Sequence, residues 1–227
     1  NENAINALVD LIRNSNHDST KLSVARSLGE IAVGNENAIN ALVDLIRNSN
    51  HDSTKLSVAR SLGEIAVGNE NAINALVDLI RNSNHDSTKL SVARSLGEIA
   101  VGNENAINAL VDLIRNSNHD STKLSVARSL GEIAVGNENA INALVDLIRN
   151  SNHDDTKSSA AYSLREILKN KHMPKVVAIL TSYLSVETYN YNPSQFENCY
   201  GIIWKCAQNM TYPEFYQAWH QQNNSTI

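Results

Sequence analysis

Five histidines occupy one position of a repeated sequence, where they could in principle act together as metal ligands. They are His17, His51, His85, His119 and His153, spaced 34 residues apart in the same polar segment. Each ligand of a shared zinc ion must lie about 2.0–2.3 Å from the metal, whereas neighbouring packed elements stand about 8–10 Å apart. We therefore interpret these histidines as exposed turn residues rather than as a ladder of metal ligands.

A second set of metal-binding residue types lies near the C-terminus: Cys199, Cys206 and His220. Three sparse residues without a paired C-x-x-C are a weak zinc pattern. The two cysteines are seven residues apart in a stretch with helical periodicity, so one helix face carries both and a disulfide between them is hindered. We expect reduced thiols in a buried core, a cytoplasmic location, no metal and no cofactor.

The common arrangements of catalytic residues are missing from the chain. No Ser-His-Asp set or pair of carboxylates stands out beyond the copies of Glu2, Asp10, Asp18 and Glu30 that repetition supplies. No phosphate-binding loop of the GxxxxGK[ST] kind occurs either. We therefore expect a protein that binds and does not catalyse.

A ladder of charged residues is the strongest candidate for a binding surface. Its members share one side of the second helix predicted in each repeat and include an aromatic replacement in the fifth; they are Ser23, Arg26, Ser27, Glu30, Arg60, Glu64, Arg94, Glu98, Arg128, Glu132 and Tyr162. One interpretation is a solvated face of neighbouring opposite charges that contributes little stability. The other is a series of weak, equal contacts that together bind an extended ligand.

The elements that position this ladder come from internal repetition. A 34-residue unit recurs unchanged four times and a fifth copy diverges after Asp154; the units span residues 1–34, 35–68, 69–102, 103–136 and 137–170. Such identity indicates recent duplication or deliberate design, and both origins stay open. Repeats of this length predict a stack of supersecondary units.

Each unit has the pattern of two helices. Ile5, Leu8, Val9 and Ile12 follow the spacing of one apolar helix face, which predicts a helix over residues 2–14. The following polar segment predicts a turn, in which Asp18 or Ser19 caps a second helix that runs to about Val33.

Two glycines of the unit have predicted structural roles. We expect Gly34 to end the second helix in a left-handed conformation, with Asn35 or Glu36 opening the next helix. Gly29 lies on the apolar side of the second helix, where a glycine costs about 1 kcal/mol against alanine. Its recurrence predicts a close approach of neighbouring helices.

The fifth unit differs from its siblings at several positions. Ser158, Tyr162, Arg165 and Leu168 replace a leucine, an arginine, a glycine and an alanine. Terminal repeats commonly carry altered faces because no identical unit packs on them. We therefore expect a different module to follow.

The segment 171–227 is that module. All aromatic residues lie between Tyr162 and Trp219. We predict a helix over Met173–Leu184, a loop over Glu187–Pro193, and two further helices. The first of these begins at a capping box of Ser194 with Glu197 and runs to about Asn209. The second begins at a capping box of Thr211 with Glu214 and has Pro213 in its first turn. The tail after Gln221 should fray.

The charge balance limits the partners. A net charge of −5 and a pI of about 5.8 give no broad basic field, so we expect no nucleic-acid or membrane-surface binding. No apolar run of membrane-spanning length and no export leader occurs. The chain begins in mid-pattern without methionine, and we expect it to be a fragment of a longer protein.

The repeats resemble a known family. A period of 34 also fits tetratricopeptide repeats, but these need aromatic residues that residues 1–161 lack. The leucine-rich first helix, the polar turn and the second helix with Ala25, Leu28, Gly29 and Ile31 resemble HEAT repeats, especially their phycobilin-lyase-like bacterial branch. Lys21 stands near the usual basic residue of the family. The usual Asp-Pro turn is replaced by residues 16–18. The resemblance covers residues 1 to about 170.

The HEAT resemblance implies an all-α fold, a right-handed α-solenoid whose second helices line a concave face, with residues 171–227 as a helical cap. The segment CYGIIWKCAQNMTYPEFYQAWH, Cys199 to His220, resembles the C-terminal helical domain that follows HEAT arrays in cyanobacterial NACHT-type NTPases. That resemblance implies a parent protein that acts as a signalling or defence switch, with the repeats as its sensor arm.

These resemblances leave three functional hypotheses. The first is a recognition arm that binds a protein or peptide ligand on the concave face. The second is a spacer or designed scaffold without a ligand. The third is a bilin-lyase-like subunit, which would need a partner subunit and a chromophore pocket. We also expect self-association through the first repeat, since nothing covers its apolar side.

Overall fold

The structure is a computed structural model that describes residues 2–221. Over these residues the chain is all-α, with no strand, as predicted. Its contacts divide it into two compact units, residues 1–113 and 114–227, which we describe separately. Each unit stacks helical pairs, which is the architecture of an α-solenoid. The predicted right-handed course and the predicted division at residue 170 stay predictions.

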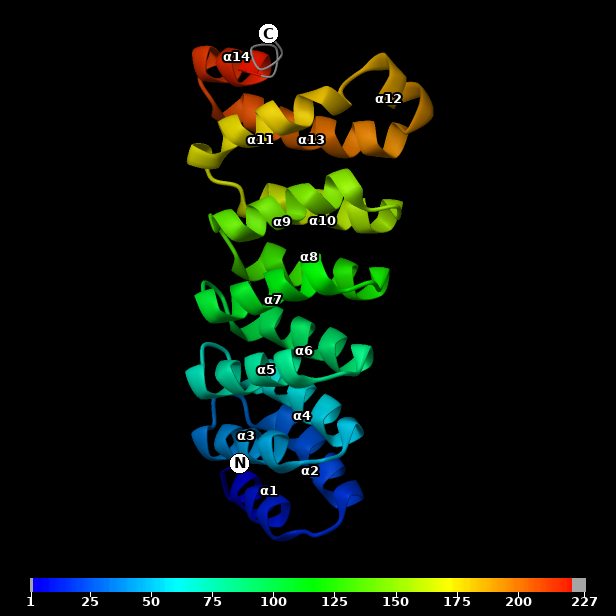
Figure 1. Cartoon of the computed structure of the whole chain (residues 1–227). Coiled ribbons are helices and arrows are strands. Elements are labelled where there is room, and N and C mark those ends of the chain that lie inside the picture. The colour runs from blue at the N-terminus through cyan, green and yellow to red at the C-terminus, as the bar shows by residue number, and fades with distance from the viewer. Residues whose placement is uncertain (1, 222–227) are drawn as a thin grey trace. The chain divides into compact units, whose positions relative to one another are not determined.

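The helices follow the repeat closely (Figure 1). Residues 1–113 contain α1 (Glu2–Asn14), α2 (Asp18–Ile31), α3 (Glu36–Asn48), α4 (Asp52–Ile65), α5 (Glu70–Asn82), α6 (Asp86–Ile99) and most of α7 (Glu104–Asn116). Residues 114–227 contain α8 (Asp120–Ile133), α9 (Glu138–Asn150), α10 (Asp154–Ile167), α11 (Met173–Leu180), α12 (Val186–Tyr191), α13 (Pro193–Asn209) and α14 (Tyr212–His220), with 3₁₀ turns at Asn170–His172 and Thr181–Tyr183.

The first helix of each pair forms as predicted. In α3, Ile39, Leu42 and Ile46 are buried on one side, in agreement with the helical spacing of the apolar residues. The helix begins at an Asn35 cap, whose Oδ1 accepts a hydrogen bond of 3.0 Å from the Ala38 N–H. This cap satisfies one of the free amides at the helix start.

The start and end of the second helix differ from the prediction. α2 begins at Asp18 after His17, which makes no side-chain cap, so neither Asp18 nor Ser19 is the cap residue. Instead, Ser15 Oγ accepts a hydrogen bond of 3.1 Å from the His17 N–H and closes the turn within itself. Asp18 in the first turn favours the helix through the macrodipole. The helix ends at Ile31, two residues before the predicted Val33.

The turn glycine has the predicted left-handed conformation and a further role. Gly34 has φ +71°, which glycine adopts without steric cost. Its N–H also donates a hydrogen bond of 2.9 Å to the Ile65 carbonyl, at the end of the second helix in the next repeat. The helix end is therefore satisfied by a neighbouring repeat rather than by solvent.

The predicted close approach at Gly29 is confirmed. A Cβ on Gly29 would lie 2.9 Å from Ser61 Oγ and 2.5 Å from Glu64 Oε2, both on α4. Gly63 stands in the same relation to Ser95 and Glu98 on α6. Second helices thus pack directly on one another through glycine.

The C-terminal helices cover the fifth pair in the second unit. α13 packs on α10 and α11, and α14 packs on α11. The predicted Met173–Leu184 helix ends as an α-helix at Leu180 and continues as a 3₁₀ turn. The predicted loop at Glu187–Pro193 is wrong, because α12 occupies most of it with Ser185 as its cap.

Of the two predicted capping boxes, one is wrong and one is confirmed. Asn192, not Ser194, caps α13 and accepts a hydrogen bond from the Gln195 N–H. The predicted end of α13 at Asn209 is correct. The Thr211 and Glu214 capping box is present, with Pro213 in the first turn. The predicted fraying tail lies outside the described residues.

Candidate functional site

The repeated histidines are exposed, as predicted, and three of them lie beside an aspartate of the preceding repeat, a contact that was not predicted. His51 Nε2 lies 3.0 Å from Asp18 Oδ2, and His85 Nε2 lies 2.9 Å from Asp52 Oδ2. In the second unit His153 Nε2 lies 2.8 Å from Asp120 Oδ2. The sequence could have indicated these contacts, because the histidine and the aspartate both recur every 34 residues. These contacts join successive repeats.

Both cysteines are buried and free, in agreement with the prediction. Burial raises the pKa of the Cys199 thiol to about 12, although the Gln195 amide, 3.7 Å from the sulfur, and Lys157 oppose that rise. Burial likewise raises the pKa of Cys206 to about 12. Thiols with a raised pKa are poor nucleophiles and poor metal ligands at neutral pH.

His220 is held by its own helix. Its Nδ1 lies 2.8 Å from the Tyr216 carbonyl, and its ring centroid lies 4.1 Å from that of Tyr216. Within residues 2–221, no group of three or more His, Cys, Asp or Glu side chains is arranged to hold a metal ion.

The predicted arginines and glutamates of the first unit lie exposed on the second helices. Arg26 and Glu30 lie on α2, Arg60 and Glu64 on α4, and Arg94 and Glu98 on α6. The Glu64 carboxylate lies over Gly29 of the preceding repeat, as the glycine geometry shows. Glu64 is thus positioned at the seam between α2 and α4, and Glu98 at the seam between α4 and α6.

The serine positions of the ladder behave differently. Ser23 is exposed and Ser27 is half-buried in the first repeat. Their equivalents Ser57 and Ser61 are buried in the next repeat, and Ser61 Oγ donates to the Ser57 carbonyl at 3.2 Å. The serine positions of the second repeat are thus covered, whereas Ser23 of the first repeat is exposed. Ser61 packs between α2 and α4, where the close approach at Gly29 leaves no room for a larger side chain.

In the second unit, Arg128, Glu132 and Tyr162 line a hollow of about 530 Å³ between α8 and α10. The remaining residues around it are Leu124, Asp155, Ser158, Ser159 and Ser163. The hollow thus brings three predicted site residues together with five that the sequence reasoning did not place in the site.

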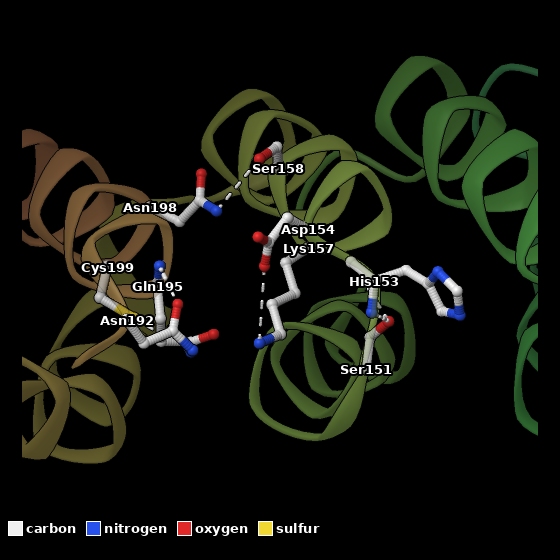
Figure 2. Close-up of polar contacts among 9 residues, drawn as sticks. All are labelled: Ser151, His153, Asp154, Lys157, Ser158, Asn192, Gln195, Asn198 and Cys199. Atoms are coloured by element: carbon white, nitrogen blue, oxygen red, sulfur yellow. Dashed lines mark hydrogen bonds and ion pairs between the residues drawn. The ribbon is translucent and has the colours of Figure 1, made fainter. Parts of the chain in front are cut away.

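The size of this hollow follows from the sequence of the fifth repeat. Ser158 replaces a leucine that the other repeats retain, as at Leu124. Ser159 Oγ donates to the Leu124 carbonyl at 3.4 Å, and Asn198 Nδ2 of α13 donates to Ser158 Oγ at 3.2 Å (Figure 2). α13 therefore fixes one wall of the hollow.

Other hollows recur with the repeat and carry less specific information. One of about 220 Å³ in the first unit is lined by Ile12, Arg13, Lys21, Ala41, Asp44, Leu45 and Asn48. Another of about 230 Å³ in the second unit is lined mainly by the residues 102 positions later. Such hollows are properties of the repeat, whereas the one at Tyr162 depends on substitutions found in the fifth repeat alone.

A row of aromatic rings follows α13. Phe196, Tyr200 and Trp204 are one turn apart, with centroids 6.3 and 6.1 Å apart and nearly parallel rings. Tyr200 and Trp204 are exposed, and α13 packs on α10, which carries Tyr162. The rings supply apolar surface on a helix adjacent to the hollow.

Lys157 is buried near the start of α10. Its Nζ lies 4.0 Å from Asp154 Oδ1 (Figure 2). The aliphatic part of a lysine side chain can be buried in this way while its ammonium group stays near a carboxylate, here that of Asp154. This pair lies within α10, whereas the hydrogen bond from Asn198 to Ser158 joins α13 to α10.

Across residues 2–221 no helix combines the length and the apolar character that crossing a bilayer requires. No curated protein matches the sequence. Among solved structures, the chain resembles the complex of CpcE and CpcF of phycocyanin lyase from Nostoc sp. PCC7120, with 15% identity, coverage of 97% of this chain and 94% of that chain, and a TM-score of 0.60. That likeness is one of fold.

A computationally designed self-assembling cyclic homo-oligomer aligns with 19% identity over 97% of this chain and 77% of its own, at a TM-score of 0.22. Residues 192–220 match a family described as NACHT C-terminal Cysteine and Histidine-containing. This range includes Cys199, Cys206 and His220. Residues 5–97 and 81–165 match HEAT repeats, over more than half of the chain. The chain belongs to the HEAT-repeat family.

Proposed function

We propose that this chain is a non-catalytic recognition arm that binds a protein or peptide ligand through the exposed side of its second helices. The observation that carries the proposal is the placement of exposed Arg and Glu side chains at equivalent positions of successive repeats, with a ligand-sized hollow at Tyr162. Contacts that recur at a fixed spacing favour an extended ligand, because several weak contacts add through multivalency.

The C-terminal match supports a place in a larger protein. Residues 192–220 resemble a domain named for its position at the C-terminus of NACHT proteins. We propose that the repeats serve as the sensor arm of a cytoplasmic NACHT-type signalling or defence NTPase, and that the ATPase lies outside these residues.

A peptide-display selection on the immobilised chain tests the function. Peptides enriched on the wild type are then measured by calorimetry against the R60E/R94E variant, which reverses two exposed charges on α4 and α6. We expect retained helicity and melting temperature, and at least tenfold weaker binding. A selection without reproducible binders would instead favour a spacer or scaffold, and unchanged affinity would place recognition elsewhere, for example at Tyr212, Tyr216 and Trp219 of α14.

A bilin-lyase-like role is a weaker second candidate. It rests on the likeness of fold to the lyase complex, at an identity that supports fold alone. Absorbance after incubation of the chain with a bilin tests it directly: a shifted and enhanced visible band would favour this role over peptide recognition.

We also propose that the first repeat self-associates. Leu11 is 46% exposed, whereas its equivalent Leu45 is 9% exposed, and Ile31 is 48% exposed against 1% for Ile65. Exposed apolar surface of this kind favours association between copies. Light scattering at rising concentration should show a dimer that an L11K/I31K variant lacks, and a strict monomer would contradict the proposal.

A further inference from the structure

The hollow at Tyr162 has a different charge from its equivalents. At the matching place between α4 and α6 the sequence supplies two arginines, Arg60 and Arg94, and one glutamate, Glu64. The hollow between α8 and α10 is instead lined by one arginine, Arg128, and two carboxylates. The side chains that line this hollow therefore carry an excess of negative charge, whereas the matching side chains carry an excess of positive charge.

Two substitutions produce this change of charge and a third adds space, and all three residues line the hollow. Asp155 replaces a serine and adds a carboxylate, Tyr162 replaces an arginine and adds a ring, and Ser158 replaces a leucine and adds space. An acid, an aromatic face and a cavity are the features that receive a cationic side chain. The same carboxylates would repel an anionic group such as a phosphate.

The Tyr162 ring already shows that it can receive a guanidinium. Arg165 Cζ lies 5.8 Å from the ring centroid, within the range of a cation–π contact, and Tyr162 as a whole residue is 59% exposed. Arg165 does not line the hollow. Its charge and that of Arg128 oppose a further cation, and the carboxylates of Asp155 and Glu132 offset them.

The hydroxyl groups match the same ligand. Ser158, Ser159 and Ser163 line the hollow, and hydroxyl oxygens can accept hydrogen bonds from a guanidinium, which carries five N–H donors. A volume of about 530 Å³ falls in the range of small-molecule sites, so an arginine side chain with its flanking backbone fits within it.

We infer that this hollow is the specificity pocket of the binding face and receives an arginine side chain of an extended peptide. The inference rests on the proposed function, which concerns the whole face. It adds that one residue of the bound peptide must be basic, and that Asp155, Ser158 and Tyr162 give the pocket its preference for that residue.

The test uses the tyrosine ring as reporter. The chain has seven tyrosines, and Tyr162 is the one within the five repeats. In a sample with ¹³C-labelled tyrosine rings, the Tyr162 signal is assigned by its loss in Y162F. N-acetyl-arginine methylamide should shift this signal saturably, with a dissociation constant on the order of 1 mM, as expected for a fragment. The lysine analogue should bind more weakly, and the glutamine and glutamate analogues should give no saturable shift.

The matched variant is D155S/S158L, which restores the residues of the sibling repeats and keeps the reporter. Because four repeats fold with these residues, we expect unchanged helicity, and at least tenfold weaker binding of the arginine probe. No saturable shift in the wild type, equal shifts from the glutamine probe, or undiminished binding in the variant would each overturn the inference. The proposed function would survive that result if peptide display still enriched ligands without arginine.

Discussion

Gly63 lies in the last turn of α4, where alanine would favour the helix by up to about 1 kcal/mol. A Cβ there would meet Ser95 Cβ at 2.9 Å and Ser95 Oγ at 2.8 Å on the neighbouring second helix. Overpacking of this kind costs about 1–3 kcal/mol, which exceeds the gain in helix propensity. Packing therefore decides the residue at this position.

We predict that G63A lowers the free energy of unfolding by about 1–2 kcal/mol, measured by urea denaturation. The matched control is G201A on α13, where the Cβ would meet only the end of the flexible Arg165 side chain, at 3.0 Å. That variant should be neutral or slightly stabilising. Equal effects of the two substitutions would contradict the role of glycine in helix approach.

The two thiols make stability depend on pH. Their pKa is raised to about 12 in the folded chain, whereas unfolded thiols titrate near 9. Their contribution to stability is therefore complete below pH 9 and is lost as the pH rises toward 12. The slope is up to about 1.4 kcal/mol per pH unit for each thiol. The C199A/C206A variant should show a flatter decline in urea melts from pH 9 to 11, and an unchanged slope would argue against buried thiols.

The exposure or burial of single residues can be predicted from the sequence where residue type and position in the repeat both indicate it. Exposed histidines, buried cysteines and the exposed Arg128 and Glu132 follow from residue type and helical position. The burial of Ser61 does not, because it depends on how closely two helices approach. Asp155 escaped notice because a single acid at a helix start has an ordinary role in capping.

Helix boundaries depend on caps that compete locally. The start of α2 at Asp18 follows from the Ser15 to His17 turn, which closes before any side chain can cap the helix. The short helix α12 went unpredicted because its sequence, VETYNY, lacks apolar periodicity. It is stabilised by the Ser185 cap and by the contact of Tyr189 with Phe196, whose ring centroids are 5.3 Å apart.

A substitution at Gly68 tests the turn that joins the second repeat to the third. It has φ +71° with no atom within 4 Å of an added Cβ, so strain rather than collision decides a substitution. We predict that G68A lowers the free energy of unfolding by about 1–2 kcal/mol. G68N should cost less, since asparagine tolerates this conformation, and both variants keep the N–H that bonds Ile99. Equal costs would indicate that the left-handed conformation is not maintained.

The order of elements along the chain was predictable, because identical units repeat one pattern of apolar positions. The arrangement of the C-terminal helices was not, since it depends on contacts such as α13 on α10 that no period specifies. The hollow at Tyr162 likewise depends on such contacts, because α10 of the fifth repeat packs on α8 of the fourth repeat and on α13 of the C-terminal segment.

Removal of residues 171–227 tests whether the C-terminal segment is a cap. α13 covers α10 in the second unit, so truncation exposes the apolar side of the fifth pair. We expect the fragment 1–170 to associate or precipitate, as seen by size-exclusion chromatography with light scattering. A truncated chain that stays monomeric and equally resistant to heat would show that the segment is not a cap.

The most direct test of the binding face is hydrogen exchange with and without a display-selected peptide. Fragments from α10 (Asp154–Ile167) are informative because their sequence differs from the identical repeats and maps to one place. We predict slower exchange in α10 and in second-helix fragments, with first-helix fragments unchanged. Slower exchange confined to the first helices, or to α14 (Tyr212–His220), would contradict recognition by the second helices.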